Sequence, residues 1–148
     1  MSPRCEVTPA PHPARPDMAF VQMLERIRYD GAYPTRERAA QALHAVLGAL
    51  GQQLIGDERV ELAARLPHEA ARTFASQVPA TQPCTGRDFV QGVASRTAGT
   101  PATARWDTSA VLLTVARLAG PDLLDRIIAQ LPAGYALLFG RRELSHAA

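Results

Sequence analysis

One arrangement of apolar and helix-ending residues occurs twice along this sequence and limits what the chain can fold into. A Phe-Val-Gln segment opens each copy, 69 residues apart, and a Leu-Pro pair with a Phe seven residues after the Pro closes each copy, 65 residues apart. The difference of four residues is about one turn of an α-helix, so a helix can lose it and keep its apolar side in register. The shared positions are Phe20, Leu66, Pro67 and Phe74 in the first copy and Phe89, Leu131, Pro132 and Phe139 in the second. All four Phe residues of the chain are among them, and we interpret the pattern as two diverged copies of one helical unit.

Apolar residues in the first copy recur at the three- and four-residue spacing of an amphipathic α-helix. Asp17, Thr35 and Asp57 each stand before such a stretch and are predicted to cap the first three helices. The third helix is expected to end at Pro67, because proline cannot continue a helix but suits the first turn of the next one. A short fourth helix then runs to Phe74. The second copy is expected to follow the same order, so the predicted fold class is all-α, with two tandem four-helix units.

Each unit is too small to bury its apolar side well alone, so we predict that the two units share one core about a pseudo-two-fold axis. Trp106 stands where the first copy has Glu37, and we expect its indole to fill that core near the start of the longer helix. The predicted organisation is a disordered proline-rich arm at 1–16, a single helical domain at 17–140 and a tail at 141–148. Within the domain, unit 1 covers about 17–75, a linker 76–86, and unit 2 about 87–140.

The basic residues of this chain are sixteen arginines and no lysine. Arginine binds phosphate and carboxylate in a bidentate way, so this bias could mark a nucleic-acid-binding protein. It also follows from a GC-rich coding sequence, which favours Arg, Ala, Gly and Pro together. The fourteen acids are interspersed among the arginines and the net charge is only +2, so we favour the second interpretation.

No segment of the sequence predicts export or insertion into a membrane. The first residues contain no apolar run of the kind found in secretory signals, and the most apolar run, 110–119, is short and interrupted by Arg117. Cys5 and Cys84 lie in the predicted arm and linker, without the spacing of metal ligands. We therefore expect a cytoplasmic protein that has no membrane, metal or cofactor partner.

Three segments near the ends of the two copies resemble a known family, the domain of unknown function 2267. They are residues 62–67 (Leu-Ala-Ala-Arg-Leu-Pro), residues 127–132 (Ile-Ile-Ala-Gln-Leu-Pro) and the ending Tyr135-x3-Phe139. The resemblance covers about residues 18–140 and implies a small bacterial helical protein with two such halves. The family brings no established activity, so the resemblance implies no catalytic residue.

Known catalytic and nucleotide-binding motifs do not occur in this sequence. GxGxxG, GxxxxGK[ST], HExxH and GxSxG are all missing. His44 adjoins the apolar stripe of the second predicted helix and is interpreted as a flanking residue. Asp57, Glu58 and Glu61 could form a metal-binding face, but the helix dipole alone favours acids in a first turn. We expect neither an enzyme nor a metal site.

Three hypotheses for the function remain. The first is an accessory or stress-associated protein that binds another protein, or itself, through its helical units. The alternative is a nucleic-acid-binding regulator that uses a basic corner at the first interhelical loop, although three acids share the same window. The four arginines of this basic corner are Arg26, Arg28, Arg36 and Arg38. A second alternative is a small-molecule-binding protein or enzyme with a pocket that the sequence does not reveal.

Overall fold

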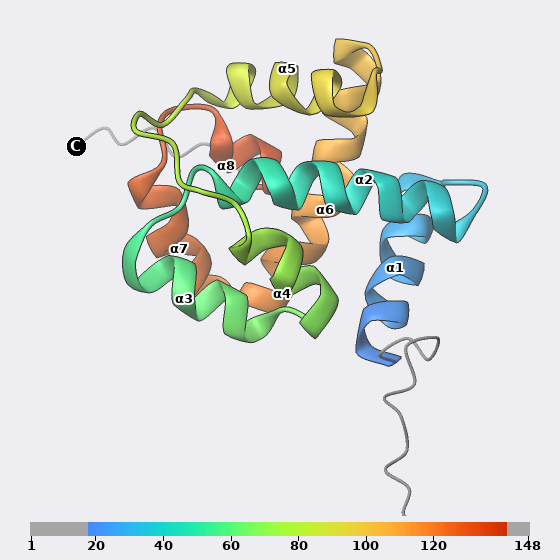
Figure 1. Cartoon of the computed structure of the whole chain (residues 1–148), viewed down its shortest axis with the longest axis horizontal. Helices are drawn as coiled ribbons and strands as arrows, with labels where there is room; N and C mark the ends of the chain where they lie inside the picture. The colour runs from blue at the N-terminus through green and yellow to red at the C-terminus, as the bar shows by residue number, and fades with distance from the viewer. Residues whose placement is uncertain (1–17, 142–148) are drawn as a thin grey trace, which may run out of the picture.

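The computed structural model describes residues 18–141, which form eight α-helices and, within that range, no strand (Figure 1). The helices are α1 (Met18–Gly31), α2 (Arg36–Gly51), α3 (Gly56–Arg65), α4 (His68–Ala75), α5 (Gly86–Thr97), α6 (Pro101–Ala119), α7 (Pro121–Gln130) and α8 (Tyr135–Leu138). The predicted all-α class is therefore confirmed. The predicted arm at 1–16, the Asp17 cap and the predicted tail beyond Arg141 lie outside the described residues.

The two long helices, α2 and α6, lie in the middle of the fold. Helix α2 packs against α1, α4, α5 and α6, and α6 packs against α1, α5, α7 and α8 as well. In Figure 1, α2 crosses the centre of the view, with α5 on one side and α3 and α4 on the other. Every shorter helix therefore packs directly on at least one of the two central helices.

A single hydrophobic cluster contains buried side chains from all eight helices. The four Phe residues belong to it and are 5% exposed or less. Burying a side chain of this size contributes roughly 1.5–3 kcal/mol relative to leaving it in water. Leu66 and Leu131 are buried as well, while Pro67 and Pro132 are half-buried. The predicted signature positions are thus packing residues.

Helix ends follow the predicted signals with one exception. The Thr35 hydroxyl caps α2 by accepting from the amide of Arg38, and α3 ends with Leu66 in extended conformation, as expected of a residue before a proline. The prediction for Asp57 is wrong, because Ile55 takes the N-cap position and no side chain caps α3. Gly56 adopts a φ of 75°, which costs a glycine little. The helix therefore begins two residues earlier than predicted, and Asp57 lies in its first turn.

Arg59 of α3 holds the ends of two other helices in place. Its guanidinium donates to the carbonyl oxygens of Leu54 at 3.0 Å and Gln77 at 2.7 Å, and it lies 5.2 Å from the ring of Phe74. The last carbonyl groups of a helix have no partner within the helix. The side chain of Arg59 thus ties the chain after α2 to the chain after α4.

The structure tests the membrane prediction only for the helices that it describes. Within residues 18–141, no helix combines the length and the apolar character needed to cross a bilayer.

Candidate interaction surface

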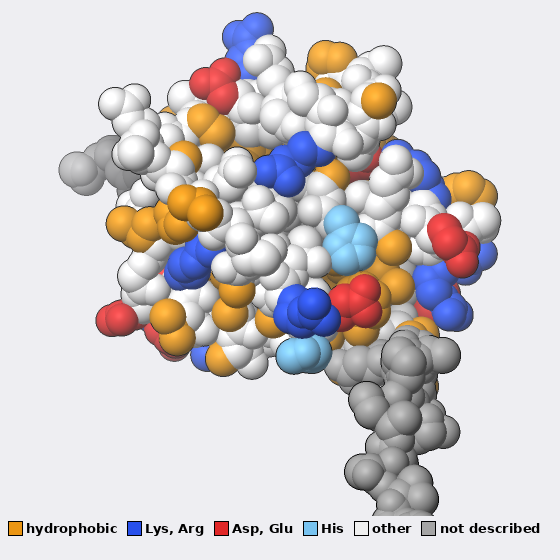
Figure 2. Space-filling model, viewed as in Figure 1, with side chains coloured by type: hydrophobic (Ala, Val, Ile, Leu, Met, Phe, Trp, Pro, Cys, Tyr) orange, Lys and Arg blue, Asp and Glu red, His pale blue; other side chains and the backbone are white. Residues whose placement is uncertain are grey.

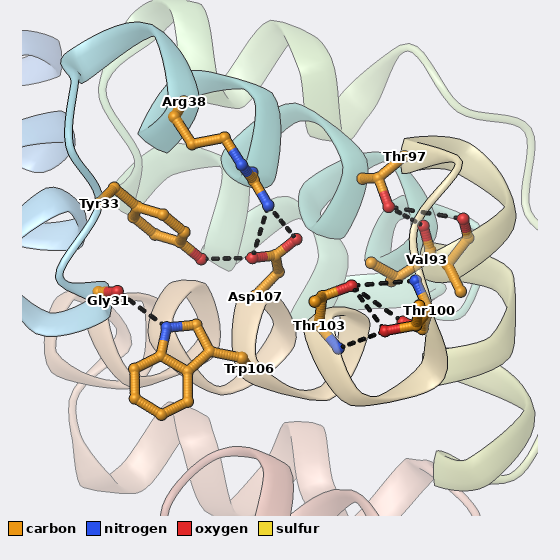
Figure 3. A network of polar contacts seen from close by, with 10 residues as sticks. Gly31, Tyr33, Arg38, Val93, Thr97, Thr100, Thr103, Trp106 and Asp107 are labelled. Carbon is orange, nitrogen blue, oxygen red and sulfur yellow. Dashed lines mark hydrogen bonds and ion pairs between the residues drawn. The ribbon is translucent and has the colours of Figure 1, made fainter.

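Helix α6 begins with a reciprocal pair of hydrogen bonds that fixes its first turn. The Thr103 amide donates to the Thr100 hydroxyl at 3.1 Å, and the Thr100 amide donates to the Thr103 hydroxyl at 3.0 Å (Figure 3). Pro101 follows the cap, where its fixed φ suits a helix start. Arg105 and Trp106, which lie on the surface, and the buried Asp107 follow within the next turn of this helix.

Asp107 points into the fold, where its carboxylate accepts the hydrogen bonds of a buried polar network. Its carboxylate is 1% exposed and accepts from the Tyr33 hydroxyl at 2.6 Å and from the Arg38 guanidinium at 3.2 and 3.3 Å (Figure 3). The Arg38 guanidinium also lies 5.1 Å from the centre of the Tyr33 ring. Burial, then the hydrogen bond to Asp107, raise the pKa of the Tyr33 phenol. The network therefore joins α6 to α2 and to the loop before it.

Trp106 does not fill the core, so that prediction is wrong. Its side chain is 56% exposed, and its indole N–H donates to the carbonyl oxygen of Gly31 at 2.8 Å (Figure 3). The buried side of α6 at this point runs through Ala104, Asp107, Thr108 and Val111. Because a helix advances about 100° per residue, Trp106 is turned away from Asp107 in the direction opposite to Thr108 and falls outside this side. The indole N–H also needs an acceptor, which the end of α1 supplies. Trp106 thus lies on the surface, and the hydrogen bond to Gly31 fixes one edge of its indole ring.

Two hollows adjoin one another on either side of Arg105. The first has a volume of about 570 Å³ and lies among α5, α6 and α8, and the second, of about 350 Å³, lies between α6 and the end of α1. Each hollow is bordered by a large, exposed apolar residue. Leu137, which is 52% exposed, borders the first, and Trp106, which is 56% exposed, borders the second. We call this region the α6 surface and define it by Arg87, Pro101, Arg105, Trp106, Leu113 and Leu137.

The charge of the α6 surface is basic. Neither Arg87 nor Arg105 forms an ion pair with any residue in the part of the chain that the structure describes. The one acid lining the hollows, Asp30, is 13% exposed and already paired with Arg117 at 2.9 Å. The surface thus presents two uncompensated guanidinium groups beside apolar side chains.

The basic corner, in contrast, is compensated by acids. Arg28 and Arg36 both pair with Glu25, at 3.5 and 2.8 Å, and the hydrogen bond from Arg36 is the largest cause of the lowered pKa of that carboxyl. The other two arginines pair with Asp30 and Asp107. Figure 2 shows red and blue side chains next to one another at the end of the molecule where α1 meets α2. Each of the four arginines is thus paired with one of three carboxylates.

The remaining candidate residues take part in local contacts. His44 is exposed and its ring Nδ1 lies 2.9 Å from the Thr73 hydroxyl, which fits the flanking position predicted for it. Glu58 and Glu61 both pair with Arg126 of α7. Among residues 18–141, no three His, Cys, Asp or Glu side chains are grouped so that they could hold a metal ion.

Sequence reasoning missed the α6 surface and the Asp107 network. A signal for the network was present, because Asp107 falls on the buried stripe of its helix with Ala104 and Val111. A buried carboxylate needs a charged or hydrogen-bonding partner. The signal for the surface was weaker, since an exposed Trp in a helix has the same local sequence as a buried one.

These features define a class: a small all-helical protein with one hydrophobic core, a buried polar network and an exposed apolar and basic face. Comparison with family models is more specific. The model of the family described as "Uncharacterized conserved protein (DUF2267)" matches residues 20–138. The chain belongs to this family, which confirms the resemblance found in the sequence. A comparison with curated proteins finds no match.

Proposed function

We propose that this chain is a non-enzymatic accessory protein that binds another protein through the α6 surface. The observation that carries the proposal is the combination of exposed Trp106 and Leu137 with two arginines, Arg87 and Arg105, that lack ion-pair partners among the described residues. Tryptophan and arginine are the residues most enriched at the energetic centres of protein interfaces. Trp106 and Leu137 border neighbouring hollows that share Arg105, so the apolar side chains and the positive charge lie in one region of the surface.

The chemistry of the surface selects one kind of partner, an acidic amphipathic helix of another protein. Such a helix would place apolar side chains in the two hollows, in the way that amphipathic helices bind grooves. Its acidic side chains would pair with Arg87 and Arg105, because complementary charge gives an interface its orientation and its partner choice. Arg105 borders both hollows and would lie at the centre of the contact.

We further propose that the domain, residues 17–140, arose by duplication and folds about a pseudo-two-fold axis, with unit 1 at about 17–75, a linker at 76–86 and unit 2 at about 87–140. Helices α3 and α7 support this, since both are ten residues long and begin 65 residues apart. Two ion pairs support it further, because each joins matching positions of the two units. Arg38 pairs with Asp107, 69 residues away, and Glu61 with Arg126, 65 residues away. Near a two-fold axis, a residue contacts its own counterpart.

Affinity capture from the extract of the native cell tests the proposed function. The bait is the full-length protein as wild type, as the double variant Arg87→Glu/Arg105→Glu, and as the control Arg72→Glu/Arg96→Glu. The control has the same change in net charge, on exposed arginines of α4 and α5. We expect a protein that the wild type and the control retain and the double variant loses.

The contact itself is then read by fluorescence. Trp106 is the only tryptophan of the chain, so its emission should change when the captured partner binds and should stay constant with the Arg87→Glu/Arg105→Glu variant. Mapping the partner should yield an acidic amphipathic segment. A partner retained equally by all three baits, a contact that leaves the emission unchanged, or a second copy of this chain as the only ligand would each refute the proposal.

A further inference from the structure

A third hollow, of about 540 Å³, lies on a different part of the molecule from the α6 surface. The first half of α1, the junction of α3 with α4 and the second half of α6 enclose it. Met23, Leu66 and Leu118 supply apolar lining, and Arg26, Arg65 and Arg117 supply three guanidinium groups. An apolar hollow with a few convergent polar groups is the usual form of a small-molecule site.

The charge of this hollow is only partly compensated. Arg26 and Arg117 share a single carboxylate, that of Asp30, at 3.4 and 2.9 Å. Arg65 donates to the carbonyl oxygen of Ala119 at the end of α6, which leaves its charge without an acid in hydrogen-bond contact among the described residues. The lining thus carries three guanidinium groups and only one carboxylate in ion-pair contact with them. Outside the lining, the pKa of the Glu61 carboxyl is lowered first by its hydrogen bond from Arg126 and also by the nearby charge of Arg65. The excess of positive charge attracts anions, most strongly at Arg26 and Arg117.

A threonine with a buried hydroxyl group lines the same hollow. Thr114 is 4% exposed, and its hydroxyl oxygen is buried without a hydrogen-bond partner in the described part of the chain. Buried hydroxyl groups in proteins nearly always have a partner, so an orphaned one calls for an explanation. Thr114 borders the hollow, and because its hydroxyl oxygen is closed to solvent in this conformation, a ligand oxygen would become its partner only after the side chain rotates about its Cα–Cβ bond.

Helix α4 adds positive potential to the same side. It starts next to Pro67, which lines the hollow, and no side chain caps its first amides. The N-terminal end of a helix carries a partial positive charge and unpaired amide groups. Alone this would not define a site, but here it stands beside three arginines and an unpaired hydroxyl.

We propose that this hollow binds an amphiphilic anion, a molecule with one carboxylate or phosphate group on a compact apolar body. The anionic group contacts Arg26 and Arg117, and also the Thr114 hydroxyl once that side chain has rotated toward the hollow, and the apolar body covers Met23 and Leu118. This site is independent of the α6 surface, so either assignment can fail without the other.

Calorimetric titration of the full-length protein with octanoate tests the site, with acetate and octanol as probes that carry only the charge or only the apolar body. Octanoate should bind more tightly than either. In the series of carboxylates from acetate to octanoate, each added methylene should strengthen binding about fourfold, as expected for burial of a CH₂ group. Equal binding of octanoate and octanol would mean that the arginines have no role and would overturn the proposal.

Two variants and a control locate the ligand. Arg117→Gln should weaken octanoate binding about tenfold, the effect of one charged hydrogen bond. Thr114→Val, which keeps the shape of the side chain, should also weaken binding while leaving the thermal midpoint of the free protein unchanged or higher. Arg105→Gln, about 18 Å away along α6, should bind as the wild type does.

The source of the anion is distinguished by vesicles. The hollow is proposed for a soluble amphiphile, so vesicles of phosphatidylglycerol should compete with octanoate no better than phosphatidylcholine vesicles do. Binding to the anionic vesicles with no binding of octanoate would place the contact on the outer surface and overturn the proposal. Octanoate binding that is unchanged in both Arg117→Gln and Thr114→Val would do the same.

Discussion

Replacing Asp107 with alanine should lower the free energy of unfolding by about 3 kcal/mol. The carboxylate is 1% exposed and accepts one hydrogen bond from Tyr33 and two from Arg38. Removing one partner of a buried ion pair costs about 3–5 kcal/mol, because the other charge stays in the fold without compensation. The lower end of this range applies, since the side chain of Arg38 is 33% exposed and water can reach part of it.

Urea unfolding followed by far-ultraviolet circular dichroism measures this loss. For a domain of this size the expected loss corresponds to a fall of about 6–12 °C in Tm. Asp125→Ala is the matched control, because Asp125 also pairs with an arginine, Arg141, but its side chain is 63% exposed. Exposed ion pairs contribute about 0–1 kcal/mol. Equal losses in the two variants would refute the reasoning, because burial would then not determine the strength of the pair.

Three further predictions concern the core, the tyrosines and the basic corner. Phe89→Ala removes a side chain that is 2% exposed and should cost about 3–5 kcal/mol. Both units should still unfold in one transition by circular dichroism and Trp fluorescence, and two separate transitions would contradict the single cluster. Burial, together with a hydrogen bond in each case, raises the pKa of Tyr33 and Tyr135 above the usual value of about 10. Their stabilising effect is complete below that pH and is lost as the pH rises further, so the protein should be less stable at a pH of about 11 than at about 9, and Tyr33→Phe should reduce this difference. Duplex DNA titrated at low ionic strength should show no salt-dependent binding, since each arginine of the basic corner already pairs with an acid, and binding that weakens steeply with added salt would revive the nucleic-acid hypothesis.

The sequence was sufficient for the features that depend on neighbours along the chain. The period of apolar residues predicted the helices, and the position of Pro67 predicted the end of α3. Thr35 was correctly predicted as a cap because a cap acts on amides two or three residues away. Asp57 was predicted wrongly because Gly56 offered a left-handed conformation that competes with the cap. At this helix start, two local signals conflict and the glycine conformation is the one adopted.

The features that depend on distant contacts could not be read from the sequence. Tyr33 and Arg38 reach Asp107 across 74 and 69 residues, and no local pattern encodes that distance. The direction of Trp106 depends on which side of α6 the other helices cover, and this is known only once the helices are packed. The α6 surface and the third hollow are each formed by three or more helices, so neither leaves a motif in one segment.

The proposed pseudo-two-fold axis gives the two ion pairs between units a common physical reason. In a symmetric dimer of one unit, a charged residue close to the axis would face an identical charge. Two copies of unit 1 in this arrangement would bring Arg38 against Arg38 and Glu61 against Glu61. Under the proposed duplication, joining the copies in one chain would let matching positions diverge. The positions that the proposal matches carry opposite charges, Arg38 against Asp107 and Glu61 against Arg126. In the proposed alignment of the two units, Trp106 stands where unit 1 has Glu37, so under this proposal the exposed face of α6 has no counterpart on α2. An isolated unit 1 should therefore neither pair with itself in this way nor bind a partner as the whole chain does.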